Sequence, residues 1–224
     1  MASPLPISTT AYYSDRALAE LLSKSAGKIL DVPYDIGKRI VSMCPTAEVG
    51  RKRMVFAGAT NPLPLTGVAL PGLHIMELDI NRLVDLTQLL AVALPPEHPD
   101  HQGNALQATS HLTELLSGEI VGPLHDASSI VIDRNGDVVA AFVANLRNSI
   151  PELSGIWLAY LLRHPRLRGS GVGTWCMNAG LKSLRTRGFP AIRFAVSADN
   201  PGPASLFLGL GFEPSSRRWT VRIP

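Results

Sequence analysis

A glycine-rich stretch, Arg168-Gly169-Ser170-Gly171-Val172-Gly173-Thr174, has the clearest chemical character in this sequence. It stands between a strand-like run and a helix-like run, so its backbone N–H groups and the positive end of the helix dipole are directed at one point. Such a point suits a phosphate group, because glycine has no Cβ atom to block the approach of the anion. The pattern predicts an anion-binding turn, and a purely structural glycine-rich turn stays open as the alternative.

Two familiar nucleotide-binding motifs fit this stretch less well. A P-loop requires a lysine after its last glycine, whereas Gly173 is followed by Thr174 and Trp175. A dinucleotide-binding turn requires a third glycine where Thr174 stands, and an acidic residue about twenty positions further on, which is missing. The P-loop is therefore excluded, while a nucleotide-dependent oxidoreductase remains an outside alternative.

The stretch resembles the Arg/Gln-x-x-Gly-x-Gly/Ala loop of the GCN5-related N-acetyltransferases, with Arg168, Gly171 and Gly173 in the matching positions. A second match follows downstream at the family's usual spacing. Asn200 closes a strand, Leu206-Phe207 come next, and Gly211-Phe212 end a helix. The resemblance covers residues 74–224 and implies that fold for this part of the chain.

The resemblance also implies a cosubstrate, acetyl-CoA (coenzyme A), with no metal. The backbone of the turn is expected to hold the pyrophosphate, and backbone groups near Leu161 and Arg163 to pair with the pantetheine arm like an added strand. Asn200 is expected to contact the same arm, and Phe207 occupies a position where many members carry a tyrosine. The implied cofactor-binding residues are Leu161, Arg163, Arg168, Gly169, Ser170, Gly171, Val172, Gly173, Thr174, Asn200 and Phe207.

The implied reaction is transfer of an acetyl or other acyl group to a primary amine of a small molecule or peptide, by direct attack on the thioester. An alkylammonium has a pKa of about 10.4, so a base must take its proton near neutral pH. Glu152, just before the strand that contains Trp157, is the candidate base. Because Phe207 lacks the hydroxyl that protonates the leaving thiolate in many members, a non-catalytic acetyl-CoA-binding module is the main alternative.

The elements that must position these residues can be read from His74 onward. Strands are expected at 75–78, 129–132, 138–143, 156–162, 192–196 and 218–223, and helices at 83–90, 104–116 and in the stretch after Gly171. Asn135-Gly136 predicts a tight hairpin turn with positive φ angles at both residues. The order predicts an α/β (α+β) fold with a mixed, mostly antiparallel central sheet and helices on both faces.

The first part of the chain looks different. An amphipathic stretch from Ser14 to Leu30 predicts a helix, and loops rich in proline and glycine follow around residues 61–72. We therefore expect residues 1–72 to form an N-terminal extension or arm, partly helical, and residues 73–224 to form the acetyltransferase domain. The sequence assigns no function to this extension.

Composition narrows the class of protein further. The net charge is +3, and no Lys/Arg run of the kind that follows the phosphates of a nucleic acid is present, so no nucleic-acid partner is predicted. No signal peptide or membrane span is expected, which favours a cytoplasmic protein. Cys44 and Cys176 lack the spacing of a redox or zinc site, and Cys176 falls among core positions of a helix. The sequence Glu97-His98-Pro99-Asp100-His101 is interpreted as a solvated loop rather than as a metal site. The oligomeric state, homodimer or monomer, stays open.

Overall fold

The computed structural model describes residues 5–7, 14–61, 70–147, 150–198 and 200–224. Most of the proline- and glycine-rich stretch, together with Asp199 after the penultimate strand, lies outside these ranges. The elements follow one another in this order: β1 (Leu5–Pro6), α1 (Asp15–Ser23), β2 (Ile29–Pro33), α2 (Tyr34–Met43), β3 (Glu48–Ala59), β4 (His74–Glu77), η2 (Ile80–Arg82), α3 (Leu83–Ala93), α4 (Ala105–Ser117), β5 (Ser129–Ile132), β6 (Val138–Arg147), η3 (Pro151–Leu153), β7 (Gly155–Arg163), η4 (Pro165–Leu167), α5 (Val172–Thr186), β8 (Ala191–Ser197), α6 (Pro201–Gly209) and β9 (Glu213–Arg222).

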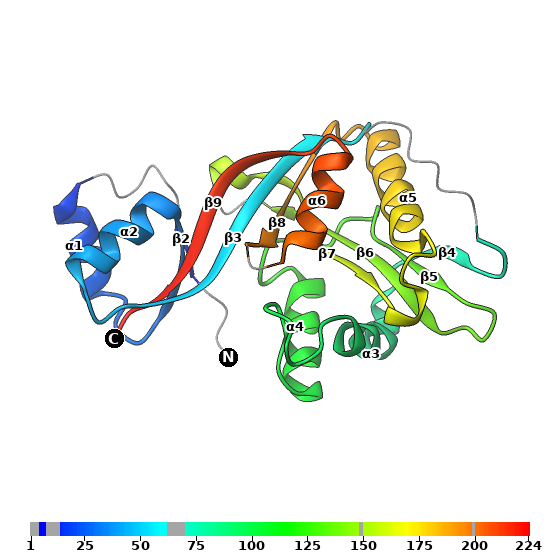
Figure 1. The fold of residues 1–224 in the computed structure, drawn as a ribbon, viewed down its shortest axis with the longest axis horizontal. Helices are drawn as coiled ribbons and strands as arrows, with labels where there is room; N and C mark the ends of the chain where they lie inside the picture. Colours follow the sequence, from blue (N-terminus) through cyan, green and yellow to red (C-terminus); the bar gives the residue numbers. More distant parts are fainter. Residues whose placement is uncertain (1–4, 8–13, 62–69, 148–149, 199) are drawn as a thin grey trace.

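A single sheet joins the described strands in the order β1-β2-β9-β3-β8-β7-β6-β5-β4. The pairs β1–β2 and β7–β8 are parallel, and the other named pairs are antiparallel. Helices α3 and α4 pack on one face of the sheet, and α5 and α6 pack on the other (Figure 1). The predicted fold class, a mixed and mostly antiparallel sheet with helices on both faces, is confirmed.

Helix α4 shows why the local predictions on this half of the chain succeed. The Asn104 side chain accepts a hydrogen bond from the Gln107 backbone N–H, and the Gln107 side chain accepts one from the Asn104 N–H, which forms a capping box. Gly118 ends the helix in the left-handed conformation with φ of 91°. Between these two signals, Leu112 and Leu116 are buried against the sheet, so sequence and structure agree here.

The hairpin between β5 and β6 forms as predicted, but its turn differs in detail. Gly136 has a positive φ of 86°, but Asn135 does not. In the described part of the chain, every residue with a positive φ is a glycine. The Asp133 side chain accepts hydrogen bonds from the backbone N–H groups of Asn135 and Asp137, which stabilises a five-residue turn in place of the tight two-residue turn. Asn135 therefore needs no strained backbone.

The N-terminal segment departs most from its prediction. The helix expected over Ser14 to Leu30 ends at Ser23, and a turn through Gly27, with φ of 73°, leads into strand β2. Helix α2 and the twelve-residue strand β3 were not predicted. The run Arg51-Lys52-Arg53 hides the strand character of β3, because a charged run lacks the apolar alternation that marks a half-buried strand.

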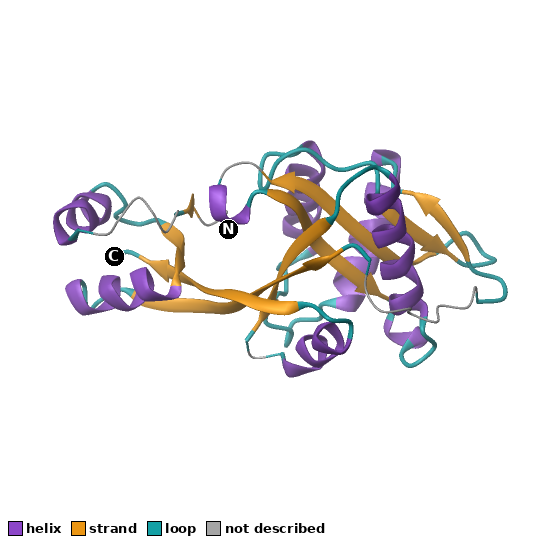
Figure 2. Ribbon diagram, turned by 90° about the horizontal axis from the view of Figure 1, so that it is seen from above, coloured by secondary structure: helices purple, strands orange, loops and turns teal. Residues whose placement is uncertain are grey.

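Two long strands link the N-terminal segment to the rest of the chain. Strand β3 is hydrogen-bonded to β8 on one side and to β9 on the other, so residues before position 72 lie inside the sheet. Strands β3 and β9 extend into a smaller lobe that holds α1 and α2 (Figures 1 and 2). That lobe has its own apolar core around Leu18, Leu30 and Ile40. The domain boundary at residue 72 stays a prediction, although the two segments share one sheet.

Helix α5 packs unusually close to β6 because Gly180 faces the ring of Phe142. A Cβ atom added at Gly180 would come within 2.5 Å of that ring, and the ring is fully buried. We expect Gly180→Ala to lower the free energy of unfolding by about 1–3 kcal/mol through overpacking. Gly209→Ala is the matched control, since a Cβ there meets nothing within 4 Å and φ is not positive. Urea denaturation of both variants measures the difference, and equal stabilities would contradict this packing.

Candidate functional site

Strands β7 and β8 separate part of the way along their length. They pair in parallel only at Ile156–Ile192, Trp157–Arg193 and Leu158–Phe194. Beyond this point β7 stays paired with β6 up to Arg163, and β8 stays paired with β3 up to Ser197. The two strands therefore diverge rather than end.

A β-bulge marks the place where the strands part. Val143 of β6 is opposite Tyr160, but the next residue, Ala144, is opposite Leu158, so Ala159 is the extra residue on β7. A bulge of this kind bends its strand and strengthens the local twist. In residues 159–163, backbone N–H and C=O groups that point away from β6 have no strand partner among the described residues. These groups are free to pair with an extended ligand.

The glycine-rich turn follows directly from the end of β7. Among the backbone N–H groups from Arg168 to Thr174, three have partners inside the protein: Arg168 bonds to Pro165 O, Ser170 to Leu167 O, and Val172 to Ser170 Oγ. The N–H groups of Gly169, Gly171, Gly173 and Thr174 have no partner in the described parts of the chain. Helix α5 begins here and runs for 15 residues, so its positive dipole end adds to four unpaired donors.

Glycine is required in this turn by its backbone conformation. Gly169 has φ of 80° and Gly171 has φ of 84°, a region that other residues rarely adopt. A Cβ atom at either position would meet nothing within 4 Å, so the space beside the turn is open. Arg163 lies against Gly173, with its Cδ atom 3.8 Å from the place of a Cβ. The turn thus combines free donors, open space and a neighbouring cation, as binding of a diphosphate requires.

The two remaining residues of the predicted cofactor site belong to α6 and its N-cap; Asn200 does not close a strand, because β8 ends at Ser197. Asn200 precedes α6, and its side-chain amide nitrogen lies 3.1 Å from Nε2 of His98. The ring of Phe207 is only 5% exposed and packs against Phe56 and Phe194, with centroid distances of 6.3 and 4.2 Å. Phe207 is therefore a core residue of this face, and its contribution to a bound cofactor would be through packing.

Glu152 lies at the other end of β7. It is exposed, in the short helix η3 that precedes the strand, and seven residues before the bulge at Ala159. The strand from Gly155 to Ala159 spans about 13 Å at the usual rise of 3.3 Å per residue. The assignment of Glu152 as base stays a prediction, and its distance along the strand from the separation weighs against it.

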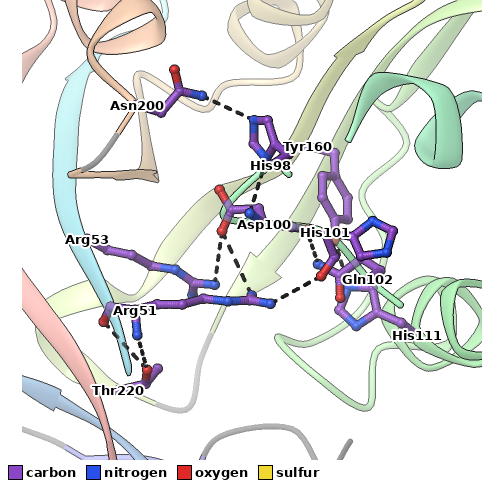
Figure 3. A network of polar contacts seen from close by, with 10 residues as sticks. All are labelled: Arg51, Arg53, His98, Asp100, His101, Gln102, His111, Tyr160, Asn200 and Thr220. Atoms are coloured by element: carbon purple, nitrogen blue, oxygen red, sulfur yellow. Dashed lines mark hydrogen bonds and ion pairs between the residues drawn. The ribbon is translucent and has the colours of Figure 1, made fainter. Parts of the chain in front are cut away.

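The loop between α3 and α4 contacts strand β3 and Asn200, the residue that precedes α6 (Figure 3). This loop was interpreted as solvated, but His98, Asp100 and His101 are each partly buried and hydrogen-bonded. Nδ1 of His98 accepts a hydrogen bond from the Asp100 N–H, and Nδ1 of His101 lies 2.8 Å from the Leu94 carbonyl oxygen. The carboxylate of Asp100 is 3.6 Å from Nη2 of Arg53 on β3.

A partly buried hydrogen bond joins Tyr160 and His111 beside this loop. The Tyr160 hydroxyl and Nε2 of His111 are 2.8 Å apart, and the two rings meet edge to face (Figure 3). Burial is the main cause that lowers the pKa of His111 below its ordinary 6.5, so the imidazole is neutral near pH 7. Burial likewise raises the pKa of Tyr160 above 10.0, so the phenol keeps its proton. The pair is a neutral donor and acceptor one residue beyond the bulge.

Sequence reasoning missed this pair. Tyr160 and His111 are 49 residues apart, and neither belongs to a motif. The one signal was that each residue places a polar atom beside apolar positions, Tyr160 within the apolar strand β7 and His111 next to Leu112 on α4. Such atoms need a partner, but the sequence does not say which.

Other residues that were considered as catalytic candidates have structural roles. Cys176 is fully buried, and burial raises the pKa of its thiol to about 12, so it is not a nucleophile. Nδ1 of His164 accepts a hydrogen bond from the Arg166 N–H and caps the short helix η4. In the part of the chain that the structure describes, no group of three or more His, Cys, Asp or Glu side chains could hold a metal ion. Across the same residues, each helix is too short or too polar to cross a bilayer.

Comparison with known proteins now decides the family. The sequence model of the acetyltransferase (GNAT) family matches residues 84–212, more than half of the chain. The chain belongs to this family. A search of curated protein sequences gives no match.

Solved structures agree with the family at the level of the fold. The GCN5-related N-acetyltransferase from Sphaerobacter thermophilus aligns with 93% of this chain at 13% identity and a TM-score of 0.59. The one from Kribbella flavida aligns with 99% at 10% identity and a TM-score of 0.61. A tandem GNAT protein from the clavulanic acid biosynthesis pathway aligns with 92% at 15% identity and a TM-score of 0.59. This chain spans 64%, 79% and 66% of the lengths of these three proteins, respectively.

The buried imidazole of His111 makes stability depend on pH. A histidine with a lowered folded-state pKa stabilises the fold above the unfolded pKa of about 6.5, and this contribution is lost as pH falls through the folded pKa. Between these two values, stability is expected to fall by up to about 1.4 kcal/mol per pH unit. The pKa of His125 is also lowered by burial, so the wild type loses stability at two sites.

Thermal unfolding of the wild type and of His111→Gln between pH 7.5 and 5 measures this contribution. We expect the variant to be less stable at pH 7.5 and to lose less stability on acidification, since only His125 still titrates in this way. Parallel pH profiles for the two proteins would show that the His111 imidazole titrates normally in the fold.

Proposed function

We propose that this protein transfers an acetyl group from acetyl-CoA to a primary amine of a small molecule or peptide by direct attack on the thioester. The proposal depends on two features that occur together. Strands β7 and β8 separate, and the turn beside them has unpaired N–H groups, among the described residues, at Gly169, Gly171, Gly173 and Thr174. Membership of the acetyltransferase (GNAT) family supports acyl transfer from acetyl-CoA in general. The acceptor class is our proposal.

The shape of the site supports a long cosubstrate with a charged end. The free N–H groups of the turn suit the pyrophosphate, and Arg163 and Arg168 supply positive charge near it. The unpaired edge of β7 around Leu161 suits the two amides of a pantetheine arm, which add to the sheet as a strand does. Both features come from the backbone, and therefore fit a ligand whose polar groups are spaced along a chain.

Acetyl-CoA, when bound, supplies a thioester whose carbonyl carbon bonds to the amine nitrogen as the C–S bond breaks. A backbone N–H near Leu161 would donate a hydrogen bond to the carbonyl oxygen as it gains negative charge. The thiolate needs no dedicated acid, because a thiol has a pKa of about 8.5 and the solvent can return its proton. The lack of a hydroxyl at Phe207 is therefore compatible with turnover.

The amine must lose a proton, and the Tyr160–His111 pair is the best-placed group to take it. The Tyr160 oxygen accepts the proton from nitrogen while its own hydroxyl proton passes over 2.8 Å to Nε2 of His111. His111 starts neutral because burial lowers its pKa, so it can accept that proton near neutral pH. Glu152 remains the competing assignment.

Calorimetry with acetyl-CoA tests the cofactor site. Gly171→Ala is expected to weaken binding at least tenfold, about 1.4 kcal/mol, because a Cβ atom disfavours φ of 84° and moves the donor groups. Gly188→Ala is the matched control, since Gly188 has φ of 85°, equally open space, and a place at the far end of α5. Equal affinities of the two variants would contradict this use of the turn.

Thiol release in the presence of an amine panel tests catalysis. We expect Tyr160→Phe and His111→Gln each to lower kcat by about a hundredfold, with the double variant no worse than either, because the two groups act as one relay. Glu152→Gln is the comparison variant. A loss confined to Glu152→Gln would transfer the role of base to Glu152, and additive losses would exclude a relay.

The same assay separates an enzyme from a binding module. Free thiol released only when an amine is present supports transfer. Tight binding of acetyl-CoA with no thiol release by any amine, in a protein whose variants at Tyr160, His111 and Glu152 behave alike, would favour the non-catalytic module.

A further inference from the structure

Two arginines of β3 face the site with few acceptors for their hydrogens. Arg51 Nη1 and Arg53 Nη2 lie 3.8 and 3.6 Å from the same Asp100 oxygen, too far for good hydrogen bonds (Figure 3). The side chain of Arg53 is 28% exposed and donates no hydrogen bond to any residue in the described ranges. Among the same residues, the Arg51 side chain donates one, a long contact of 3.4 Å to the His101 carbonyl oxygen. Most of the ten N–H donors of this pair are therefore available.

A third arginine reaches the same face of the sheet from β6. Arg147 is 6% exposed, its guanidinium stacks 4.6 Å above the ring of Trp157, and its Nε atom has no hydrogen-bond partner among the described residues. Trp157 packs with Val55 of β3 in one buried cluster, and Arg53, two residues from Val55, is directly opposite Arg218 of β9. Burial is the main cause that lowers the pKa of Arg147, but the pKa remains about 10, so Arg147 is charged at pH 7. A charge this deeply buried, with no ion pair to a carboxylate of the described residues, is costly unless an anion joins it.

The charges of this region do not balance. Arg218 is fully engaged, since it bonds to the Asp31 side chain at 2.9 Å and to two backbone carbonyl oxygens. Four arginines, at 51, 53, 147 and 218, face two carboxylates, Asp31 and Asp100, which leaves an excess of two positive charges. Figure 3 shows Arg51 and Arg53 directed at Asp100, with Tyr160 on the other side of the loop that carries Asp100. Tyr160 packs with the apolar cluster of α3 and α4. The excess positive charge therefore lies near Tyr160, where the proposed acceptor amine would approach.

We infer that Arg53 and Arg51, backed by Arg147, bind a carboxylate of the acceptor, so that the acceptor is an amino-acid-like molecule with a primary amine and a carboxylate. The inference rests on the proposed acetyl transfer and narrows its acceptor class. The planar fork of a guanidinium matches the two oxygens of a carboxylate. Asp100 occupies part of this site in the free protein, and its long contacts make it easy to displace or to share.

Burial distinguishes this site from a surface for a large polyanion. A nucleic acid needs exposed cations along a groove, whereas Arg53 and Arg51 are only 28% and 35% exposed and Arg147 is 6% exposed. A small carboxylate fits between partly buried guanidinium groups. The same charges repel an ammonium, so they also favour the free amine that attacks the thioester.

Matched acceptors test the inference by thiol release. The pair γ-aminobutyrate and butylamine, and the pair alanine and isopropylamine, differ mainly in the carboxylate, while putrescine replaces it with a second cation. We expect kcat/KM for at least one amino acid to exceed that of its matched amine at least tenfold, as hydrogen bonds to charged groups allow, with putrescine the poorest acceptor.

Substitutions then assign the effect to the arginines. Arg53→Gln is expected to abolish the preference for the carboxylate, mainly through KM, and to leave butylamine almost unchanged. Arg53→Lys is expected to keep part of the preference. Arg217→Gln is the control, because Arg217 is exposed on the same strand pair and faces the other side of the sheet.

Equal use of γ-aminobutyrate and butylamine, or of alanine and isopropylamine, in both pairs, would overturn the inference, as would a preference for putrescine or an equal loss for all acceptors in Arg53→Gln. If no amine releases thiol, the proposed function fails, but the carboxylate site is still decided by calorimetry with γ-aminobutyrate and alanine in the presence of coenzyme A. Binding that Arg53→Gln removes and Arg217→Gln retains supports the site, and no binding to the wild type refutes it.

Discussion

The separation of β7 from β8 is the constraint on which the rest of the site depends. Parallel neighbours in a sheet normally pair along their whole length, but here pairing stops after Leu158 and Phe194. The unpaired backbone groups are tolerable only because each strand keeps its outer partner, β6 for β7 and β3 for β8. The extra residue at Ala159 provides the bend. Without it, the sheet would close, and neither a strand-like ligand nor its thioester end would have a place.

The two faces of the sheet divide the chemistry between them. On the face of α5 and α6, the polar groups that matter belong to the backbone of the turn, and the side chains, Phe207 included, form an apolar core. On the other face, side chains are proposed to act: Tyr160 with His111 in proton transfer, and the arginines of β3, which lie near Asp100, in recognition of the acceptor. This division follows from the ligands that each face is proposed to hold. A pyrophosphate is held well by N–H groups at a helix end, whereas proton transfer and recognition of an acceptor require particular side chains.

The N-terminal segment contributes directly to this second face. Strand β3 lies between β8 and β9, which places Arg51 and Arg53 at the edge of the separation. The small lobe holds the other end of these strands through the core around Leu30 and through the ion pair of Arg218 with Asp31. A stretch that looks like an appendage in the sequence is thus the source of the charges that we assign to acceptor recognition.

The sequence by itself determined what depends on neighbouring residues. The turn at Arg168–Thr174, the capping box of Asn104, the stop at Gly118 and the β5–β6 hairpin all depend on contacts within a few positions, so residue types and spacing were enough. The tertiary structure alone decided what depends on strand order. It placed β3 inside the sheet, joined Tyr160 to His111 across 49 residues, and set Asp100 beside Arg53. Local preferences cannot specify such pairs. A polar side chain needs a hydrogen-bond partner when it is buried, but only the packed sheet determines which residue that partner is.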